Sequence, residues 1–317
     1  MKKLQNFTAG NPNITTTYAG EAAADYIAAA LLSAKTLDNQ LVTIKPNVKF
    51  KEVIQKLDVS GIVQDASCDF VTSGSVAVTE RILEPKELQV NLSLCKQEFV
   101  DSWEALSLGY SAFDEIPRNF TDYLVSYVGG KVAEATEQSI WTGAATNGQF
   151  AGFEGILTDS SGSSDSAIFA TGSNYALTKE NIVPTLTAVV DAIPDTVYGK
   201  DDLVIYASTK AMKTWQSSQS GQVNVGSFNN QLNVGEKPAN FQGIELVHAP
   251  GLSPDVLIAG QKSNFFFGTG LLSDRNEVRV LDMANLDGSQ NFRVIMRYTA
   301  GVQTGINAEV VTFGLLP

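Results

Sequence analysis

The stretch NFTDYLVSYVGGKVAEATEQSIWTG, residues 119–143, carries the strongest structural signal in the chain. Its apolar residues recur every three or four positions, which predicts one long amphipathic helix. These residues are Phe120, Tyr123, Leu124, Tyr127, Val128, Ala135 and Ile140. Asn119 is a favourable N-terminal cap, and Gly143 is a favourable C-terminal stop. Between this cap and this stop the predicted helix is roughly 33 Å long, at about 1.5 Å per residue.

Two glycines, Gly129 and Gly130, lie in the middle of this predicted helix. Each costs about 1 kcal/mol relative to alanine in a helix interior. We therefore predict that Gly129 and Gly130 mark a bend in the helix, or a close approach of another backbone.

Two alternating segments, residues 75–83 and 88–94, precede the helix and predict β-strands. Glu84, Pro85, Lys86 and Glu87 lie between them and are typical of a turn, so we expect a β-hairpin. Many of its alternate residues are polar, and a two-stranded hairpin is barely stable alone. This hairpin must therefore lie on the body of its own subunit or be stabilised by a neighbour.

The rest of the chain has a mixed helix and strand pattern. Before the hairpin we expect a polar arm and one alanine-rich helix, at 21–34. After the long helix we expect further helices at 178–192 and 209–219, and loops at 158–174 and 216–240. The expected strands are 203–207, 244–249, 256–259, 277–281, 292–299 and 306–313.

Composition excludes several classes of protein. The 317 residues carry a net charge of -12 and are 44% hydrophobic, which is typical of a globular chain. Phosphate binding needs clustered Lys and Arg, and the sequence has no such run. We expect no signal peptide and no membrane span, because no apolar stretch is long enough. The two cysteines, Cys68 and Cys95, are compatible with a reducing compartment, and nothing in the sequence supports a disulfide between them.

Residues for catalysis are scarce. His248 is the single histidine, and no nucleophile elbow accompanies it. One histidine and two cysteines cannot supply a conventional zinc site. The segment starting Gly268-Thr269-Gly270 lacks the third glycine of a dinucleotide fingerprint. Asp201 and Asp202 could bind a cation, although two solvated carboxylates in a loop are the default. The sequence predicts no enzyme, no cofactor and no metal.

The long helix and its exit resemble the spine helix of Hong Kong 97-type major capsid proteins of tailed double-stranded DNA bacteriophages. In that family the helix ends in an acidic residue, an apolar pair and a glycine, followed by a loop and Gly-Ile/Leu. Glu137, Ile140-Trp141, Gly143 and Gly155-Ile156 fill those places. The resemblance continues at 203–208, 241–247 and 298–303.

The resemblance implies an α+β capsid fold in five segments. These are an N-terminal arm (1–47), an extended-loop region with the β-hairpin (48–100), and a peripheral domain with the spine helix (101–177). An axial α/β domain (178–260) follows, and strands of 261–317 return to the peripheral domain. Part of the family cross-links its extended loop through a lysine. Lys86 or Lys96 could serve, but no matching motif surrounds a partner asparagine.

The same resemblance implies a shell subunit that assembles into pentamers and hexamers and encloses phage DNA without sequence-specific binding. Scaffolding, portal and decoration proteins are the partners that it implies. The expected location is the virion capsid, assembled in the host cytoplasm. Two alternatives remain open, an encapsulin-like cellular nanocompartment and, more remotely, a cytoplasmic α/β enzyme using Asp201, Asp202 or His248.

Overall fold

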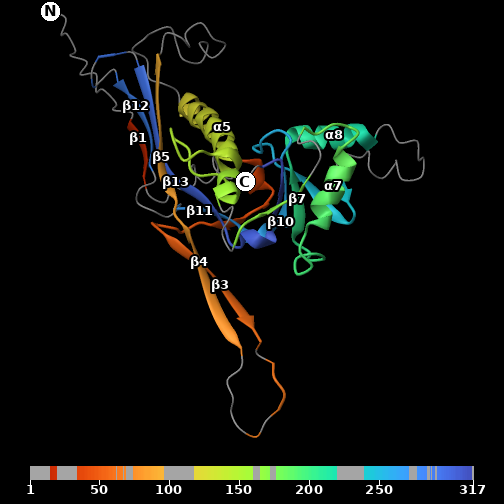
Figure 1. Ribbon diagram of the computed structural model, residues 1–317. Coiled ribbons are helices and arrows are strands. Elements are labelled where there is room, and N and C mark those ends of the chain that lie inside the picture. Colours follow the sequence, from red (N-terminus) through yellow and green to blue (C-terminus); the bar gives the residue numbers. More distant parts are fainter. Residues whose placement is uncertain are drawn as a thin grey trace, which may run out of the picture.

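A computed structural model describes residues 15–19, 34–61, 63–66, 68, 74–95, 118–159, 165–171, 176–219, 239–270, 277–283, 286, 288–289 and 291–315. In this part of the chain the body contains two six-stranded sheets, and a two-stranded ribbon projects from it (Figure 1). The expected helix at 21–34 and the expected loop at 216–240 lie mostly outside the described residues.

The first sheet is built around the 14-residue strand β13. Its strand order is β1-β12-β13-β11-β2, and β5 also pairs with β13, beyond the end of β11. The bounds are β1 Thr15–Ala19, β2 Thr43–Lys45, β5 Lys86–Cys95, β11 Phe265–Thr269, β12 Glu277–Asp282 and β13 Asn291–Thr304. One face of β13 is apolar and buried, with Phe292, Val294 and Met296 at alternate positions.

The long helix α5, Arg118–Thr142, confirms the predicted long helix and begins one residue before the expected cap Asn119. Its 25 residues span about 37 Å. Val128, Val132 and Ile140 are buried in the same core as β13, and α5 contacts both β13 and the short helix α6, Phe153–Asp159. The Gly-Ile/Leu exit of the helix therefore lies within α6.

The second sheet has the order β6-β14-β10-β7-β9-β8. Its strands are β6 Ile168–Phe169, β7 Leu203–Ala207, β8 Ala239–Phe241, β9 Ile244–His248, β10 Leu257–Gln261 and β14 Val311–Phe313. The helices α7, Ile182–Asp191, and α8, Thr209–Gln219, pack on it, α7 against β10 and β14 and α8 against β7. β7 is buried on both faces, with Tyr206 in the core shared with α5 and Ile205 in the core under α7 and α8.

Two short 3-10 helices connect the sheets. η1, Lys262–Asn264, joins β10 to β11, and η3, Asn307–Glu309, joins β13 to β14. Asn264 links these crossings, because its side-chain amide donates to the Ile306 carbonyl and its amide oxygen accepts from the Ile306 N–H, both at 2.7 Å. The last strand, β14, belongs to the second sheet, so the expected return of all closing strands to the peripheral domain is wrong for β14.

The expected pairing of the hairpin is also wrong. β4, Ser75–Leu83, pairs with β3, Glu52–Ser60, whereas β5 runs antiparallel to β13. Glu84 and Pro85 are therefore the corner between the projecting ribbon and the first sheet. β5 joins this sheet because Leu88 and its alternate apolar neighbours pack on the core, which buries more apolar surface than an isolated hairpin can.

Candidate assembly surfaces

The β3–β4 ribbon extends away from both sheets (Figure 1). Val53 pairs with Ile82, and Val78 lies on the same face four residues along β4. These three side chains are 47%, 50% and 54% exposed. Phe50, just before β3, is 67% exposed. The ribbon thus presents a row of apolar side chains to solvent, with a Gln55 to Glu80 hydrogen bond of 2.7 Å crossing the same face.

The base of this ribbon is fixed to the body. Leu83 is fully buried and packs on Gly268, where an added Cβ would lie 2.8 Å from the Leu83 Cδ2 atom. The Arg81 guanidinium donates to the Asp165 carboxylate from both Nε (3.1 Å) and Nη2 (2.8 Å). Gln303 donates to the Ile82 carbonyl at 2.9 Å. Because the base is held, the direction of the ribbon is set by the body.

The four residues predicted at the hairpin turn lie at this base. Glu84 forms an exposed ion pair with Lys51 at 2.9 Å. Pro85 lies against Gly301, where a Cβ would approach the Pro85 Cα to 2.9 Å. Lys86 donates to the carbonyls of Ala145 and Gln149, at 2.9 and 3.0 Å. Glu87 is an exposed residue of β5, opposite Thr299 of β13.

These contacts show Lys86 tying the first sheet to the loop after α5. Lys96, the other lysine considered for cross-linking, lies outside the described residues. Both cysteines are free, Cys68 exposed and Cys95 half-buried.

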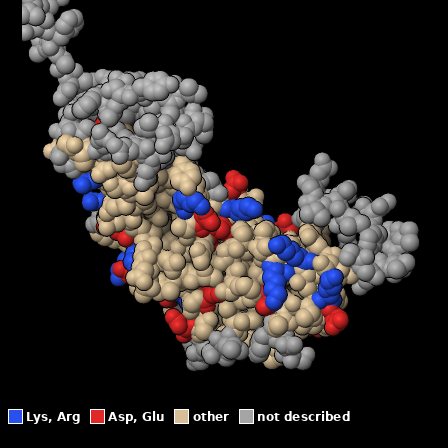
Figure 2. All heavy atoms as spheres, turned by 90° about the horizontal axis from the view of Figure 1, so that it is seen from above, with Lys and Arg blue, Asp and Glu red and all other residues tan. Residues whose placement is uncertain are grey.

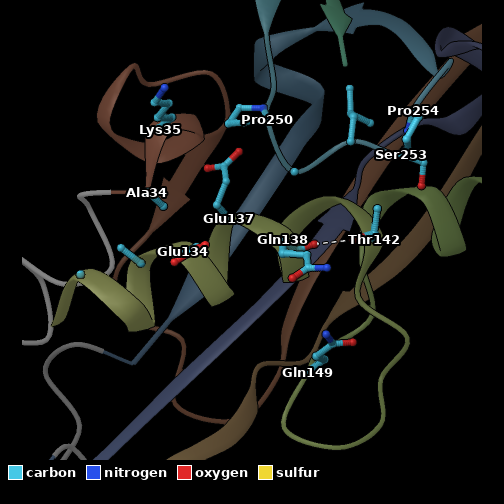
Figure 3. Close-up of a pocket in the computed structure, with 14 residues that line it drawn as sticks. Ala34, Lys35, Glu134, Glu137, Gln138, Thr142, Gln149, Pro250, Ser253 and Pro254 are labelled. Carbon is cyan, nitrogen blue, oxygen red and sulfur yellow. Dashed lines mark hydrogen bonds between the residues drawn. The ribbon is translucent and has the colours of Figure 1, made fainter. Parts of the chain in front are cut away.

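The two helix glycines have different surroundings. Gly129 is buried, whereas Gly130 is exposed and has no atom within 4 Å of the position that a Cβ would take. The helix is continuous through both. Gly130 also borders a hollow of about 860 Å³ between α5, Ala34 and Lys35, and the turn 250–254 (Figure 3).

Two of the three residues considered for catalysis, His248 and Asp202, are hydrogen-bonded into the fold. His248 Nε2 lies 2.9 Å from the Thr209 hydroxyl, and burial together with nearby Lys35 lowers the pKa of His248. Asp202 accepts hydrogen bonds from Gln261 at 2.8 Å and from the Ser263 hydroxyl at 2.5 Å. Burial alone would raise the pKa of Asp202, but these hydrogen bonds outweigh burial and lower it. Asp201 is exposed.

The described residues contain no group of three His, Cys, Asp or Glu side chains placed to hold a metal ion. Gly268 and Thr269 belong to β11, so they form no phosphate-binding loop. No helix in the described ranges is long and apolar enough to cross a membrane. Figure 2 shows basic and acidic side chains interspersed on the face that it presents, without a large area of one sign.

Sequence reasoning missed β3 and therefore the exposed row on the ribbon. A weak signal was present, because Val53 and Ile54 are β-branched and Leu57, Asp58 and Val59 alternate between apolar and polar. No local signal identified β3 as the partner of β4, since the connection 61–74 has no two-residue turn motif.

No protein-family model and no curated protein matches the chain. Solved structures do match across most of it. The capsid of a native GTA particle is 13% identical, with a TM-score of 0.61 and coverage of 90% of this chain and 89% of that one. A chain of Mycobacterium phage Che8 is 14% identical, with a TM-score of 0.53 and coverage of 86% and 89%.

A chain of the procapsid of satellite phage P4, a particle that includes the size determination (Sid) protein, is 9% identical, with a TM-score of 0.52 and coverage of 91% and 96%. This chain therefore has the mixed α+β fold of phage and GTA capsid structures. That is the fold implied by the resemblance of residues 119–157.

Proposed function

We propose that the chain is the major capsid protein of a tailed phage, a structural subunit that assembles with copies of itself into pentamers and hexamers of an icosahedral shell around double-stranded DNA. The observation that carries this proposal is the projecting β3–β4 ribbon with its exposed row Val53, Val78 and Ile82. The shared capsid fold supports the same function.

An exposed apolar ribbon favours association. A two-stranded ribbon is at best marginally stable in water, and its apolar face gains free energy when it is covered. The ribbon points away from its own body, so the cover must come from another molecule. In a shell each copy can give one ribbon and receive one, which stabilises every subunit by association.

Flexibility of the spine helix completes the proposal. One fold must occupy both pentamers and hexamers, which requires small changes of shape. Gly129 and Gly130 are the candidate bend, since glycine lowers the cost of deforming the helix there. The net charge of -12 is consistent with a shell that encloses DNA without binding its phosphates tightly. The virion, assembled in the host cytoplasm, is the proposed location, and scaffolding, portal and decoration proteins are the proposed partners.

Electron microscopy of the purified protein at high concentration tests the proposal, with co-expressed neighbouring genes supplying any scaffold. We expect closed icosahedral shells. Protein that stays monomeric under all these conditions would overturn the proposal. Shells that carry cargo enzyme in place of DNA would support the encapsulin-like alternative.

The ribbon has its own deletion test. Residues 55–80 are replaced by Asn-Gly, because Ile54 and Arg81 are directly opposed and a two-residue turn can join them. A deletion that reached into β5 would remove part of the core and is unsuitable. We expect a folded body that forms no shells, and wild-type shells from this variant would show that the ribbon has no part in assembly.

A further inference from the structure

The base of the β3–β4 ribbon is attached to parts of both sheets. Leu83 packs on β11 of the first sheet, and Gln303 of β13 donates to the Ile82 carbonyl at 2.9 Å. Arg81 makes a different attachment, because it binds Asp165, on the segment that leads into β6 of the second sheet. Arg81 thus relates the direction of the ribbon to the second sheet as well as to the first.

Asp165 uses its two carboxylate oxygens for different partners. Oδ2 accepts from both Nε (3.1 Å) and Nη2 (2.8 Å) of Arg81, and the main-chain carbonyl of Asp165 accepts from the same Nη2 at 3.3 Å. Oδ1 accepts from the N–H of Ala308, at 2.9 Å, in η3 just before β14. Since β6 and β14 are paired, Asp165 connects Arg81 to the entry of both strands.

Arg81 and the exposed apolar row lie on opposite faces of β4. The alternation of the strand places Val78 and Ile82 on one face, and Arg81 and Leu83 on the other. The side chains of Arg81 and Asp165 are 22% and 30% exposed, whereas Val78 and Ile82 are about half exposed. A substitution of Arg81 therefore changes the attachment of the ribbon without changing the row that is proposed to meet a neighbour.

The ribbon is long enough that a small change at its base displaces this row. Each of its strands has nine or ten positions or fewer, with nine in both β3 and β4, so the ribbon extends roughly 30 Å at about 3.3 Å per residue. Val78 lies roughly 16 Å from Leu83 along β4. A change of direction of about 15° would then move Val78 by about 4 Å and the far end by about 8 Å. Apolar side chains touch only within about 4.0–4.5 Å, so such a change is enough to lose a contact.

We propose that Arg81 and Asp165 are positioning residues for assembly, which fix the direction of the ribbon relative to the second sheet. The assembly part rests on the proposed function. A guanidinium is suited to this role, since its nitrogens lie in one rigid plane and fix an orientation as well as a distance. A lysine ammonium in the same place would fix only a distance.

Two variants break the contact from opposite sides. Arg81→Met keeps an unbranched side chain but removes the donors. Asp165→Asn has nearly the same volume, and with its amide oxygen on the Ala308 N–H its NH2 group faces the guanidinium, donor against donor. The matched control is Glu84→Gln, which makes the same change from carboxylate to amide in the ion pair with Lys51. Those side chains are 60% and 57% exposed, so the control should have little effect.

Pulsed electron spin resonance between two spin labels on the full-length protein measures the direction of the ribbon. Cys68, exposed in the connection between β3 and β4, carries one label. Asp201→Cys, at an exposed position just before β7 of the second sheet, carries the other, and Cys95→Ser removes the remaining thiol. Concentrations below the onset of assembly keep the measured distances within one subunit.

We expect the control to have the distance distribution of the parent protein. In both contact variants the distribution should shift or widen by about 4–8 Å, as the length of the ribbon implies. Calorimetry checks that the variants are folded, and should Arg81→Met fail to fold, Asp165→Asn provides the same comparison. Unchanged distances in the folded variants would overturn the role of this ion pair in setting the direction of the ribbon.

Electron microscopy of the unlabelled variants measures assembly. We expect fewer closed shells for Arg81→Met and Asp165→Asn, and wild-type shells for Glu84→Gln. Changed distances together with wild-type shells would overturn the role of the pair in assembly. If the wild type itself forms no shells, the proposed function fails, while the distances still decide whether Arg81 and Asp165 set the direction of the ribbon.

Discussion

Replacing the exposed apolar row of the ribbon tests the proposed assembly contact quantitatively. The perturbation is the triple variant Val53→Ser, Val78→Ser, Ile82→Ser. In the isolated subunit these side chains are about half exposed. Their replacement therefore removes little packing from the body, which contains its own core on the two sheets.

The expected magnitude follows from the exposed area. Full burial of a Val or Ile side chain is worth roughly 1.5–3 kcal/mol, so covering the exposed half is worth about 1 kcal/mol each. The three together contribute about 3 kcal/mol per ribbon. Since 1.4 kcal/mol corresponds to a factor of ten, the critical concentration for shell formation should rise about 100-fold. Val53 and Ile82 are paired neighbours whose single effects need not add, which is why the triple variant is used.

Analytical ultracentrifugation across a concentration series measures the critical concentration, and calorimetry measures the melting temperature of the subunit. The control is Val53→Ile, Val78→Ile, Ile82→Val, which keeps the row apolar and should assemble like the wild type. A folded serine variant that assembles at the wild-type concentration would refute the idea that neighbours cover this face.

Three further predictions concern the body. Gly130→Ala should stabilise the subunit by about 1 kcal/mol in calorimetry, because the Cβ meets open space in a helix; a lower melting temperature would contradict this, and fewer closed shells would support a bend at this position. Because the pKa of His248 is lowered in the folded state, the unfolded chain binds more protons than the folded chain below about pH 6.5. The free energy of unfolding should therefore decrease as the pH is lowered through this range, and His248→Gln should flatten this dependence in chemical denaturation. Gly251→Ala would place a Cβ 2.2 Å from the Glu137 carbonyl oxygen and should cost roughly 1–3 kcal/mol, whereas Gly155→Ala in α6, with open space, should not destabilise; equal melting temperatures would contradict the packing argument.

The longer helices and several of the strands could be predicted from the sequence. The long helix, α8 and β7 appear at or within one residue of their predicted bounds, because apolar periodicity, caps and stops act over a few neighbouring residues. The glycine and acidic residues at the exit of the long helix also carried the resemblance that the solved structures confirm at the level of the fold.

The strand pairing and the candidate assembly surface could be identified only from the tertiary structure. Glu84 to Glu87 have the composition of a hairpin turn, yet β5 pairs with β13, about 200 positions away, because that sheet buries its apolar face. Because β5 pairs with β13, β4 pairs with β3 in the projecting ribbon, where Val53, Val78 and Ile82 remain exposed. Arg81 was visible as a charged residue in a predicted strand, but its partner Asp165 lies 84 positions away. Local sequence sets which elements form, whereas competition for long-range burial decides which faces remain exposed for a neighbour.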